Sequence, residues 1–124
     1  MSPKNTIFAA ALMLVLVMLG AGCAKEVSFS KNVMPILEQH CLACHKPGGP
    51  GYETSGLSME SYQSLMKGTK FGSVTKPGYS GASTLVIMME YEHDPVAMPR
   101  GSKPLAPEQL KLVKTWIDQG AKDN

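Results

Sequence analysis

The sequence has few aromatic residues, few charges and no long run of alternating apolar and polar residues. Aromatic residues make up 6% of the 124 residues and charged residues 18%. A chain of this length holds at most one domain, which excludes a TIM barrel and a two-domain dinucleotide-binding enzyme. The hydrophobic share of 44% is that of a globular chain. Because aromatic residues are so few, we expect the fold to need a cross-link or an embedded group to complete its core.

The sequence also lacks an excess of charge of one sign. The formal net charge is +2, and lysine and arginine form no cluster. This excludes the strong positive field with which proteins attract nucleic acid, so we expect no nucleic-acid partner. The missing period-two pattern argues against a sheet, and the 12 glycines and 9 prolines indicate long loops.

The N-terminus has the pattern of an export signal. Lys4 is followed by an uncharged apolar run from Ile7 to Leu19, and small residues then precede Cys23. A positive start, an apolar stretch and small residues before a cut are typical of a secretory signal. Since the cysteine directly follows the small residues, the segment resembles a bacterial lipoprotein signal peptide. In that family the cysteine is lipidated and becomes the new N-terminus. The resemblance implies a signal peptide over residues 1–22, and a lipid anchor at Cys23 that opens a tether reaching residue 30.

Two other interpretations fit the same residues. The apolar run from Ile7 to Ala24 is just long enough to cross a membrane as an uncleaved helix. Alternatively the signal is cut elsewhere, and Cys23 remains a free thiol. All three interpretations export residues 24–124 from the cytoplasm. We therefore expect a domain over residues 31–121 at the periplasmic face of the inner or outer membrane, or at the cell surface.

Helical periodicity and capping signals predict an all-α chain with about four helices. Ser30 and Ser83 are candidate N-terminal caps, and Gly68 and Gly120 are candidate stops. Residues 46–56 are rich in glycine and proline, so we expect a loop there. The predicted helices cover residues 32–40, 58–67, 84–90 and 107–119.

The strongest chemical signal is the run Cys41-Leu-Ala-Cys44-His45. It is the C-x-x-C-H motif that attaches c-type haem. Two intervening residues let one helical turn place both thiols at the two vinyl groups on one edge of the porphyrin. His45 is then directed at the iron, which it binds through Nε2 while Nδ1–H donates to a carbonyl that fixes the ring. We expect residues 46–56 to supply that carbonyl.

Other uses of these residues have less support. A disulfide between Cys41 and Cys44 would close a very small loop and stabilise little. A thioredoxin-like redox pair would come with a βαβ pattern, which the sequence lacks. A zinc site would need a fourth ligand besides the two thiolates and His45, and no second Cys/His pair at finger spacing exists. His40, next to the first cysteine, is expected at the surface or beside a haem propionate.

The second axial ligand must come from the opposite side of the haem, and so from far along the chain. Met98 lies in the stretch Val-Ala-Met-Pro-Arg-Gly, and a loop restricted by proline can present a thioether to iron. His93 and an open iron site are the alternatives, because methionines on helices usually fill the core. The remaining methionine candidates are Met34, Met59, Met66, Met88 and Met89.

The exported part of the chain resembles a class I monohaem cytochrome c, and more closely the planctomycete-type cytochrome c domain. The matching stretches are PILEQHCLACH, GLSMESYQSLMKG, KPGYSGASTL, AMPRG and LKLVKTWIDQGA. The resemblance implies a small cytochrome c fold wrapped around one covalent haem c. It also implies that Cys41 and Cys44 attach the haem, that His45 is the proximal ligand, and that Met98 is the distal ligand. Trp116 would pack on the attachment helix across the haem edge.

Two strong axial ligands fill the iron, and one-electron transfer is then the remaining chemistry. We therefore expect a membrane-anchored electron carrier and not an enzyme, monomeric, which meets redox partner proteins at the haem edge near Cys41 and Cys44. One alternative is a subunit through which electrons enter or leave a larger exported oxidoreductase. Another is a haem-based sensor in which Met98 dissociates and a small ligand binds.

The lipid anchor can be tested at its cysteine. Replacing Cys23 by Ser should move the exported domain from the membrane fraction to the soluble fraction, because no acyl chain would hold it. Fractionation of cells that express the wild-type and variant chains measures this. A variant that stays with the membranes would instead indicate the uncleaved helix.

Overall fold

The structure is a computed structural model that describes residues 25–91 and 97–124. Within these ranges the chain is helical and contains no strand, which confirms the all-α prediction. One isolated bridge joins Thr69 to Gly72. The elements, in chain order, are the π-helical turn η1 (Phe29–Val33), α2 (Met34–His40), α3 (Pro50–Ser55), α4 (Tyr62–Lys67), the 3₁₀ turn η2 (Ser80–Ala82), α5 (Thr84–Glu90) and α6 (Pro107–Asp118).

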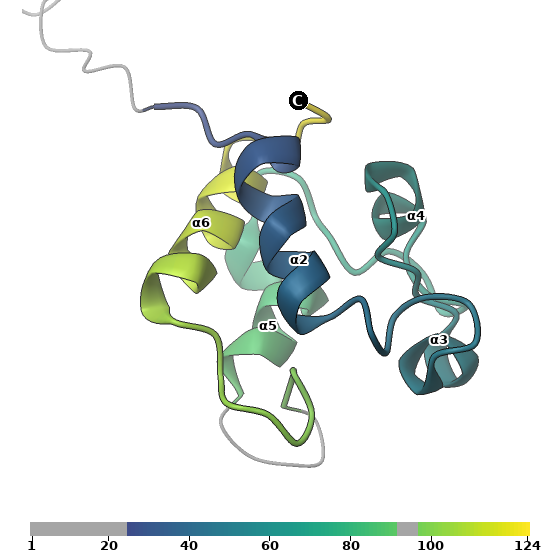
Figure 1. Cartoon of the computed structure of the whole chain (residues 1–124). Helices are drawn as coiled ribbons and strands as arrows, with labels where there is room; N and C mark the ends of the chain where they lie inside the picture. The colour runs from purple at the N-terminus through teal and green to yellow at the C-terminus, as the bar shows by residue number, and fades with distance from the viewer. Residues whose placement is uncertain (1–24, 92–96) are drawn as a thin grey trace, which may run out of the picture.

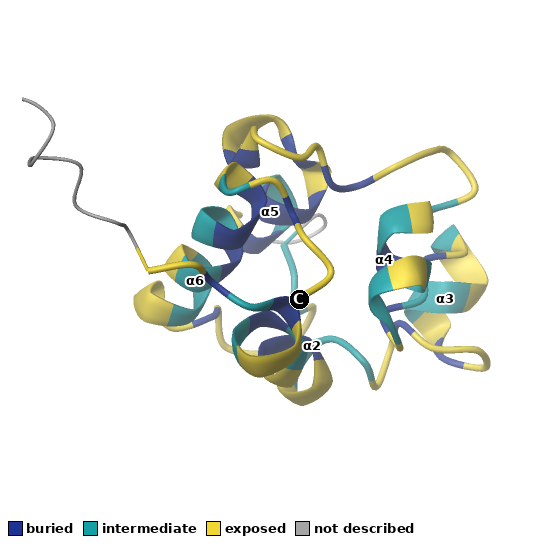
Figure 2. Cartoon of the chain, turned by 90° about the horizontal axis from the view of Figure 1, so that it is seen from above, coloured by how far each residue is buried: buried dark blue, intermediate teal, exposed yellow. Residues whose placement is uncertain are grey.

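The helices form two groups (Figures 1 and 2). The first group contains α2, α5 and α6, and its contacts carry most of the buried core. The second group contains the short helices α3 and α4, which lie beside the first group in both views. The chain crosses between the groups twice, once after α2 and once after α4. This arrangement places the segment after α2, which holds the C-x-x-C-H motif, at the junction of the two groups.

The first helical run begins earlier than the sequence predicts. Ser28, and not Ser30, is the cap, because its hydroxyl accepts a hydrogen bond from the Lys31 amide at 3.2 Å. The Asn32 side chain in turn accepts from the Ser28 amide at 2.9 Å. These two bonds start the run at Phe29, and η1 continues without a break into α2.

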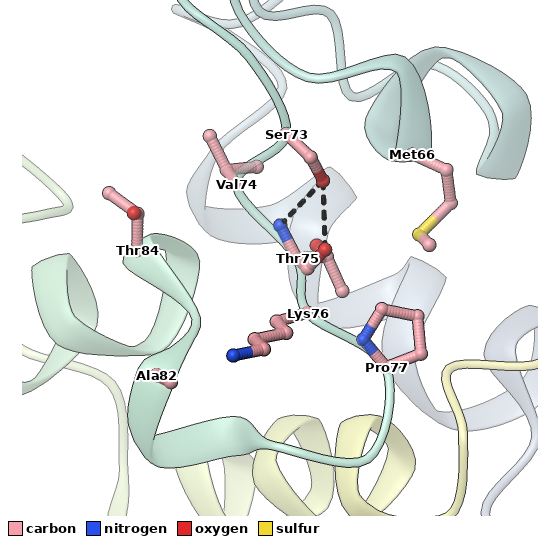
Figure 3. Close-up of a pocket in the computed structure, with 8 residues that line it drawn as sticks. All are labelled: Met66, Ser73, Val74, Thr75, Lys76, Pro77, Ala82 and Thr84. Carbon is pink, nitrogen blue, oxygen red and sulfur yellow. Dashed lines mark hydrogen bonds between the residues drawn. The ribbon is translucent and has the colours of Figure 1, made fainter.

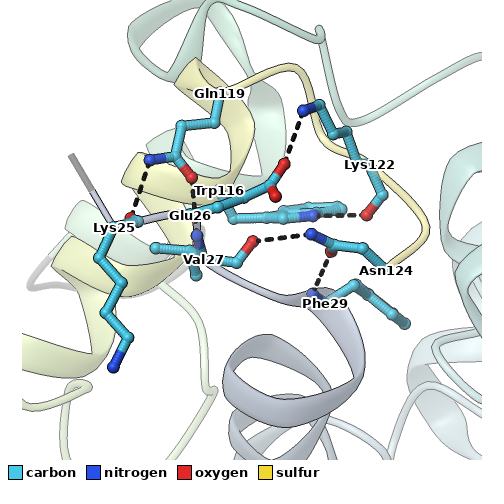
Figure 4. Close-up of polar contacts among 8 residues, drawn as sticks. All are labelled: Lys25, Glu26, Val27, Phe29, Trp116, Gln119, Lys122 and Asn124. Atoms are coloured by element: carbon cyan, nitrogen blue, oxygen red, sulfur yellow. Dashed lines mark hydrogen bonds and ion pairs between the residues drawn. The ribbon is translucent and has the colours of Figure 1, made fainter. Parts of the chain in front are cut away.

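Residues 25–30, which we expected within a lipid-anchored tether, pack into the fold. Val27 and Phe29 are buried against α6. The last residue, Asn124, accepts a hydrogen bond from the Ser30 amide at 2.9 Å through its backbone oxygen. The two ends of the described chain therefore lie together, as Figure 4 shows in detail.

Trp116 of α6 is fully buried, but not where the resemblance implies. Its ring centroid lies 5.3 Å from that of Phe29 and 6.4 Å from that of Tyr62, and its Nε1 donates to the Lys122 carbonyl at 2.9 Å. This aromatic cluster joins α6 to η1 and α4. The indole thus packs on the start of the helical run that contains α2, far from the two cysteines at its other end.

The segment 46–56 was expected to be a loop, and that prediction is wrong. Residues Pro50–Ser55 form α3, which has proline in its first turn and ends at Gly56 with a positive φ of 76°. Proline is favourable at a helix start and glycine just after its end. The Ser55 hydroxyl donates to the Gly51 carbonyl at 2.7 Å within the helix. The glycine and proline that indicated a loop are the start and stop of a short helix.

Two further helices differ from prediction mainly at their starts. The helix expected from residue 58 begins at Tyr62, because Ser61 and Ser64 form a reciprocal capping box. It ends at Gly68, as predicted. Helix α5 is confirmed over Thr84–Glu90, although the hydroxyl of Ser83 does not cap it.

The C-terminal helix is close to its prediction. It runs from Pro107 to Asp118 and buries Val113, Trp116 and Ile117. Ala106 offers no side-chain cap, and Gln109 compensates in part by accepting from the Ala106 amide at 3.2 Å. Among the residues that the structure describes, no helix is long and apolar enough to span a bilayer.

The hydroxyl of Tyr62, in the second helix group, donates a hydrogen bond of 2.8 Å to the Ala121 carbonyl near the end of the chain. The contribution of this bond to stability can be measured. Replacing Tyr62 by Phe should lower the free energy of unfolding by about 0.5–1.5 kcal/mol, the usual net value of one such bond. Chemical denaturation gives this difference.

Tyr79→Phe is the matched control, since the Tyr79 side chain is 63% exposed. We expect its denaturation midpoint to equal that of the wild type. Equal midpoints for both variants would show that the Tyr62 bond does not stabilise the fold.

Candidate haem site

One cavity of about 520 Å³ lies at the junction of the two helix groups. Its walls come from the end of α2, from α3 and α5, and from the loop that precedes α6. Its volume falls in the range of about 300–1,000 Å³ that small-molecule and cofactor sites occupy. All four haem-site residues predicted from the sequence line it: Cys41, Cys44, His45 and Met98.

The two cysteines are set by a tight turn that follows α2 directly. The Cys41 amide donates to the Leu37 carbonyl at 2.9 Å, which ends the helix. The amides of Cys44 and His45 then both donate to the Cys41 carbonyl, at 3.1 and 3.0 Å. Both thiols are free, and Cys44 is exposed while Cys41 is half-buried. The turn therefore presents two unpaired thiols and an imidazole to one cavity.

The electrostatics at Cys41 do not suit a thiolate. Burial raises the pKa of the Cys41 thiol to about 11, and the neighbouring Cys44 adds to the rise. Reactive and metal-binding cysteines have lowered pKa values instead. In addition, the described residues place no group of three or more His, Cys, Asp or Glu side chains where it could hold a metal ion. The geometry thus gives no support to the redox-pair and zinc interpretations.

His45 is held as a neutral ring in one orientation. It is buried, and its Nδ1 lies 3.4 Å from the Leu57 carbonyl oxygen. Burial lowers the pKa of His45 below its ordinary value, while the bond to Leu57 acts in the opposite direction. With Nδ1–H donating to that carbonyl, Nε2 is the nitrogen left to bind a metal. The orienting carbonyl therefore belongs to Leu57, one residue beyond the segment that we expected to supply it.

Glycines of α3 make room for this imidazole. A Cβ on Gly51 would lie 2.8 Å from Cε1 and 3.0 Å from Nδ1 of His45. A Cβ on Gly49, just before the helix, would lie 2.5 Å from the Cys44 carbonyl oxygen. The backbone at the start of α3 thus lies so close to the His45 ring that only glycine fits at position 51. The sequence alone did not predict this contact.

Met98 reaches the cavity from the loop before α6. Its amide donates to the Met88 carbonyl at 2.9 Å, which fixes the loop to α5. Met59, Met88 and Met89 also line the cavity, whereas Met34 and Met66 do not. The structure thereby reduces the methionine candidates from six to four. His93 and Cys23 lie outside the residues that the structure describes.

The donor set and the shape of the cavity fit a haem. Two free thiols and a buried imidazole line the cavity together, and Gly51 leaves room beside the His45 ring that a Cβ would fill. His40, which we expected at the surface or beside a haem propionate, also lines the cavity and is half-buried. These observations show that the residues present fit a haem.

A second, shallower cavity of about 490 Å³ adjoins the first (Figure 3). The two share Val74 and Thr84 in their walls. Lys76 is the one charged residue that lines it, and the Thr75 hydroxyl nearby is buried without a partner. It contains none of Cys41, Cys44, His45 and Met98, so we assign the haem to the first cavity.

A helical fold around a cavity that joins a C-x-x-C-H turn to methionine side chains defines a small c-type cytochrome domain. The family model described as Planctomycete cytochrome C matches residues 41–101. This match supports a planctomycete-type cytochrome c domain over those residues, as the resemblance predicts. A cytochrome c domain implies haem c and electron transfer by that haem. No curated protein and no solved structure matches the chain.

The contact between Gly51 and His45 gives a prediction. Replacing Gly51 by Ala should displace the imidazole or α3 and destabilise the haem-loaded protein by about 1–3 kcal/mol, the usual cost of overpacking. Chemical denaturation measures the loss. The electron paramagnetic resonance spectrum of the oxidised form should change as well, because it reports the geometry of the axial ligands.

Gly81→Ala is the matched control. A Cβ at Gly81 would meet no heavy atom within 4 Å. We expect it to leave both the stability and the resonance spectrum close to those of the wild type. If Gly51→Ala behaves like Gly81→Ala, α3 does not position the His45 ring.

Proposed function

We propose that this chain is an exported, membrane-anchored cytochrome with one c-type haem, which carries single electrons between redox partner proteins. The observation that supports it most is that Cys41, Cys44, His45 and Met98 line one cavity. These residues come from two segments more than 50 positions apart in the chain, and only the fold brings them together.

Each residue has a separate role in this proposal. Cys41 and Cys44 hold the porphyrin through thioether bonds, and their free thiols are placed by the turn that closes on the Cys41 carbonyl. His45 would bind the iron through Nε2, with its ring fixed by Leu57. Met98 would supply the second protein ligand from a loop fixed to α5. When bound, the haem exchanges one electron between its ferric and ferrous states.

The protein's contribution to electron transfer is to keep the ligands neutral and the surroundings apolar. Burial is the main cause of the lowered pKa of His45, and it favours the neutral imidazole. A thioether ligand favours ferrous iron and raises the reduction potential relative to two histidines. Two protein ligands also leave no position for a substrate, which supports a carrier over an enzyme.

Localisation is proposed from the sequence alone. We place a signal peptide over residues 1–22, a lipid at Cys23, and the folded domain at the periplasmic face of a membrane or at the cell surface. Partners are redox proteins met at the exposed edge near Cys44, and the chain acts as a monomer.

The experiment that tests this function compares the wild type with Met98→His. Wild-type protein from a host that matures c-type cytochromes should keep its haem spectrum after denaturation, and its reduced form should not bind carbon monoxide rapidly at neutral pH. Met98→His should lower the midpoint potential by on the order of 0.1 V, part of the roughly 0.8 V range that axial ligands cover. Spectroelectrochemical titration measures it.

Met66→Leu is the control, because Met66 does not line the haem cavity. Its potential should match that of the wild type. An unchanged potential in Met98→His would show that Met98 is not a ligand. Rapid binding of carbon monoxide by the wild type would indicate a sensor rather than a carrier.

A further inference from the structure

The first described residues are fixed to the end of α6, at one end of the molecule (Figure 4). The Val27 amide donates to Gln119 Oε1 at 2.8 Å, and Gln119 Nε2 donates to the Lys25 carbonyl at 3.2 Å. An ion pair of 2.6 Å joins Lys122 Nζ to Glu26 Oε1. The fold therefore holds the chain from residue 25 onward, and no long free segment separates the domain from the residues before it.

Cys23 precedes this fixed segment by two positions. Two extended residues span at most about 7 Å. An acyl chain on Cys23 would hold the bilayer surface against the end of the molecule where Lys25 and Lys122 lie. This step depends on the lipid anchor of the proposed function.

The haem cavity lies at the other end of the molecule. Starting beside the C-terminus, η1 and α2 run through residues 29–40, and the cavity begins where α2 ends, at Gln39 and His40. At the α-helical rise of about 1.5 Å per residue, this run covers about 18 Å. Figure 1 shows the C-terminus at the top of the view, the end of α2 below the middle and the loop before α6 at the bottom.

We infer that the cavity end faces away from the bilayer and that its partner is a water-soluble redox protein. The side chains that a partner would meet there are exposed: Ala43 and Cys44 on the attachment turn, then Lys46, and Lys103 on the loop before α6. A partner confined to the hydrocarbon region would have to approach the opposite end, where the aromatic cluster around Trp116 separates it from the cavity.

The orientation can be measured by lysine footprinting. Haem-loaded, lipidated protein is bound to phosphatidylcholine–phosphatidylglycerol vesicles, treated with a membrane-impermeant amine reagent and analysed by mass spectrometry. The soluble Cys23→Ser form is the matched control. We expect Lys25 and Lys122 to react several-fold more slowly on vesicles than in the soluble form. Lys46 and Lys103 should react at the same rate in both.

Two other outcomes of the footprinting would contradict either the lipid anchor or the orientation on the bilayer. Protein that does not sediment with the vesicles refutes the lipid anchor and this inference with it. Protein that sediments but shows protection of Lys46 and Lys103, or of no lysine, retains the anchor and refutes the orientation.

A kinetic measurement gives an independent test. Electron exchange with a water-soluble redox protein should be equally fast for the vesicle-bound and soluble forms. A flexible glycine–serine insertion between Ala24 and Lys25 should leave that rate unchanged. A rate that falls on vesicles and recovers with the insertion would show that the cavity end faces the membrane.

Discussion

The haem cavity between the two helix groups is the feature on which the rest of the structure depends. The cavity has a volume of about 520 Å³ and separates side chains of α2, α3, α5 and the loop before α6. The side chains that line it therefore do not complete a core among themselves, which agrees with the small number of aromatic residues in the sequence. The embedded group is a structural component as well as the redox centre.

The cavity also determines the chemistry of its ligands. Burial lowers the pKa of His45 and so favours its uncharged form. Thioether sulfur and neutral imidazole are ligands that an apolar site accepts without a desolvation penalty for a charge. The bond between His45 and Leu57 then selects the tautomer, so one environment sets both protonation and orientation.

The helical class, the attachment turn and the approach of Met98 could all be predicted from the sequence, because each depends on a local pattern. The C-x-x-C-H spacing is contained in five residues, and the end of α4 at Gly68 requires only one glycine. Features that depend on tertiary contacts could not be predicted. Helix α3 looks like a loop by composition. The bond from the His45 ring to the Leu57 carbonyl involves a backbone atom, so the leucine side chain gives no sign of it. The site of Trp116 is determined by Phe29 and Tyr62, neither of which is near it in the sequence.

The meeting of the two chain ends has a consequence for how this domain can be built into larger proteins. The Asn124 backbone oxygen accepts from the Ser30 amide at 2.9 Å, and its side chain accepts from the Phe29 amide at 2.7 Å. A domain whose entry and exit lie side by side can be inserted into a surface loop of another protein with little distortion of the host. Since the cavity lies at the far end, such an insertion leaves the redox centre accessible. The position of residues 25–30 beside residue 124 thus keeps the cavity end of the molecule free of both chain connections.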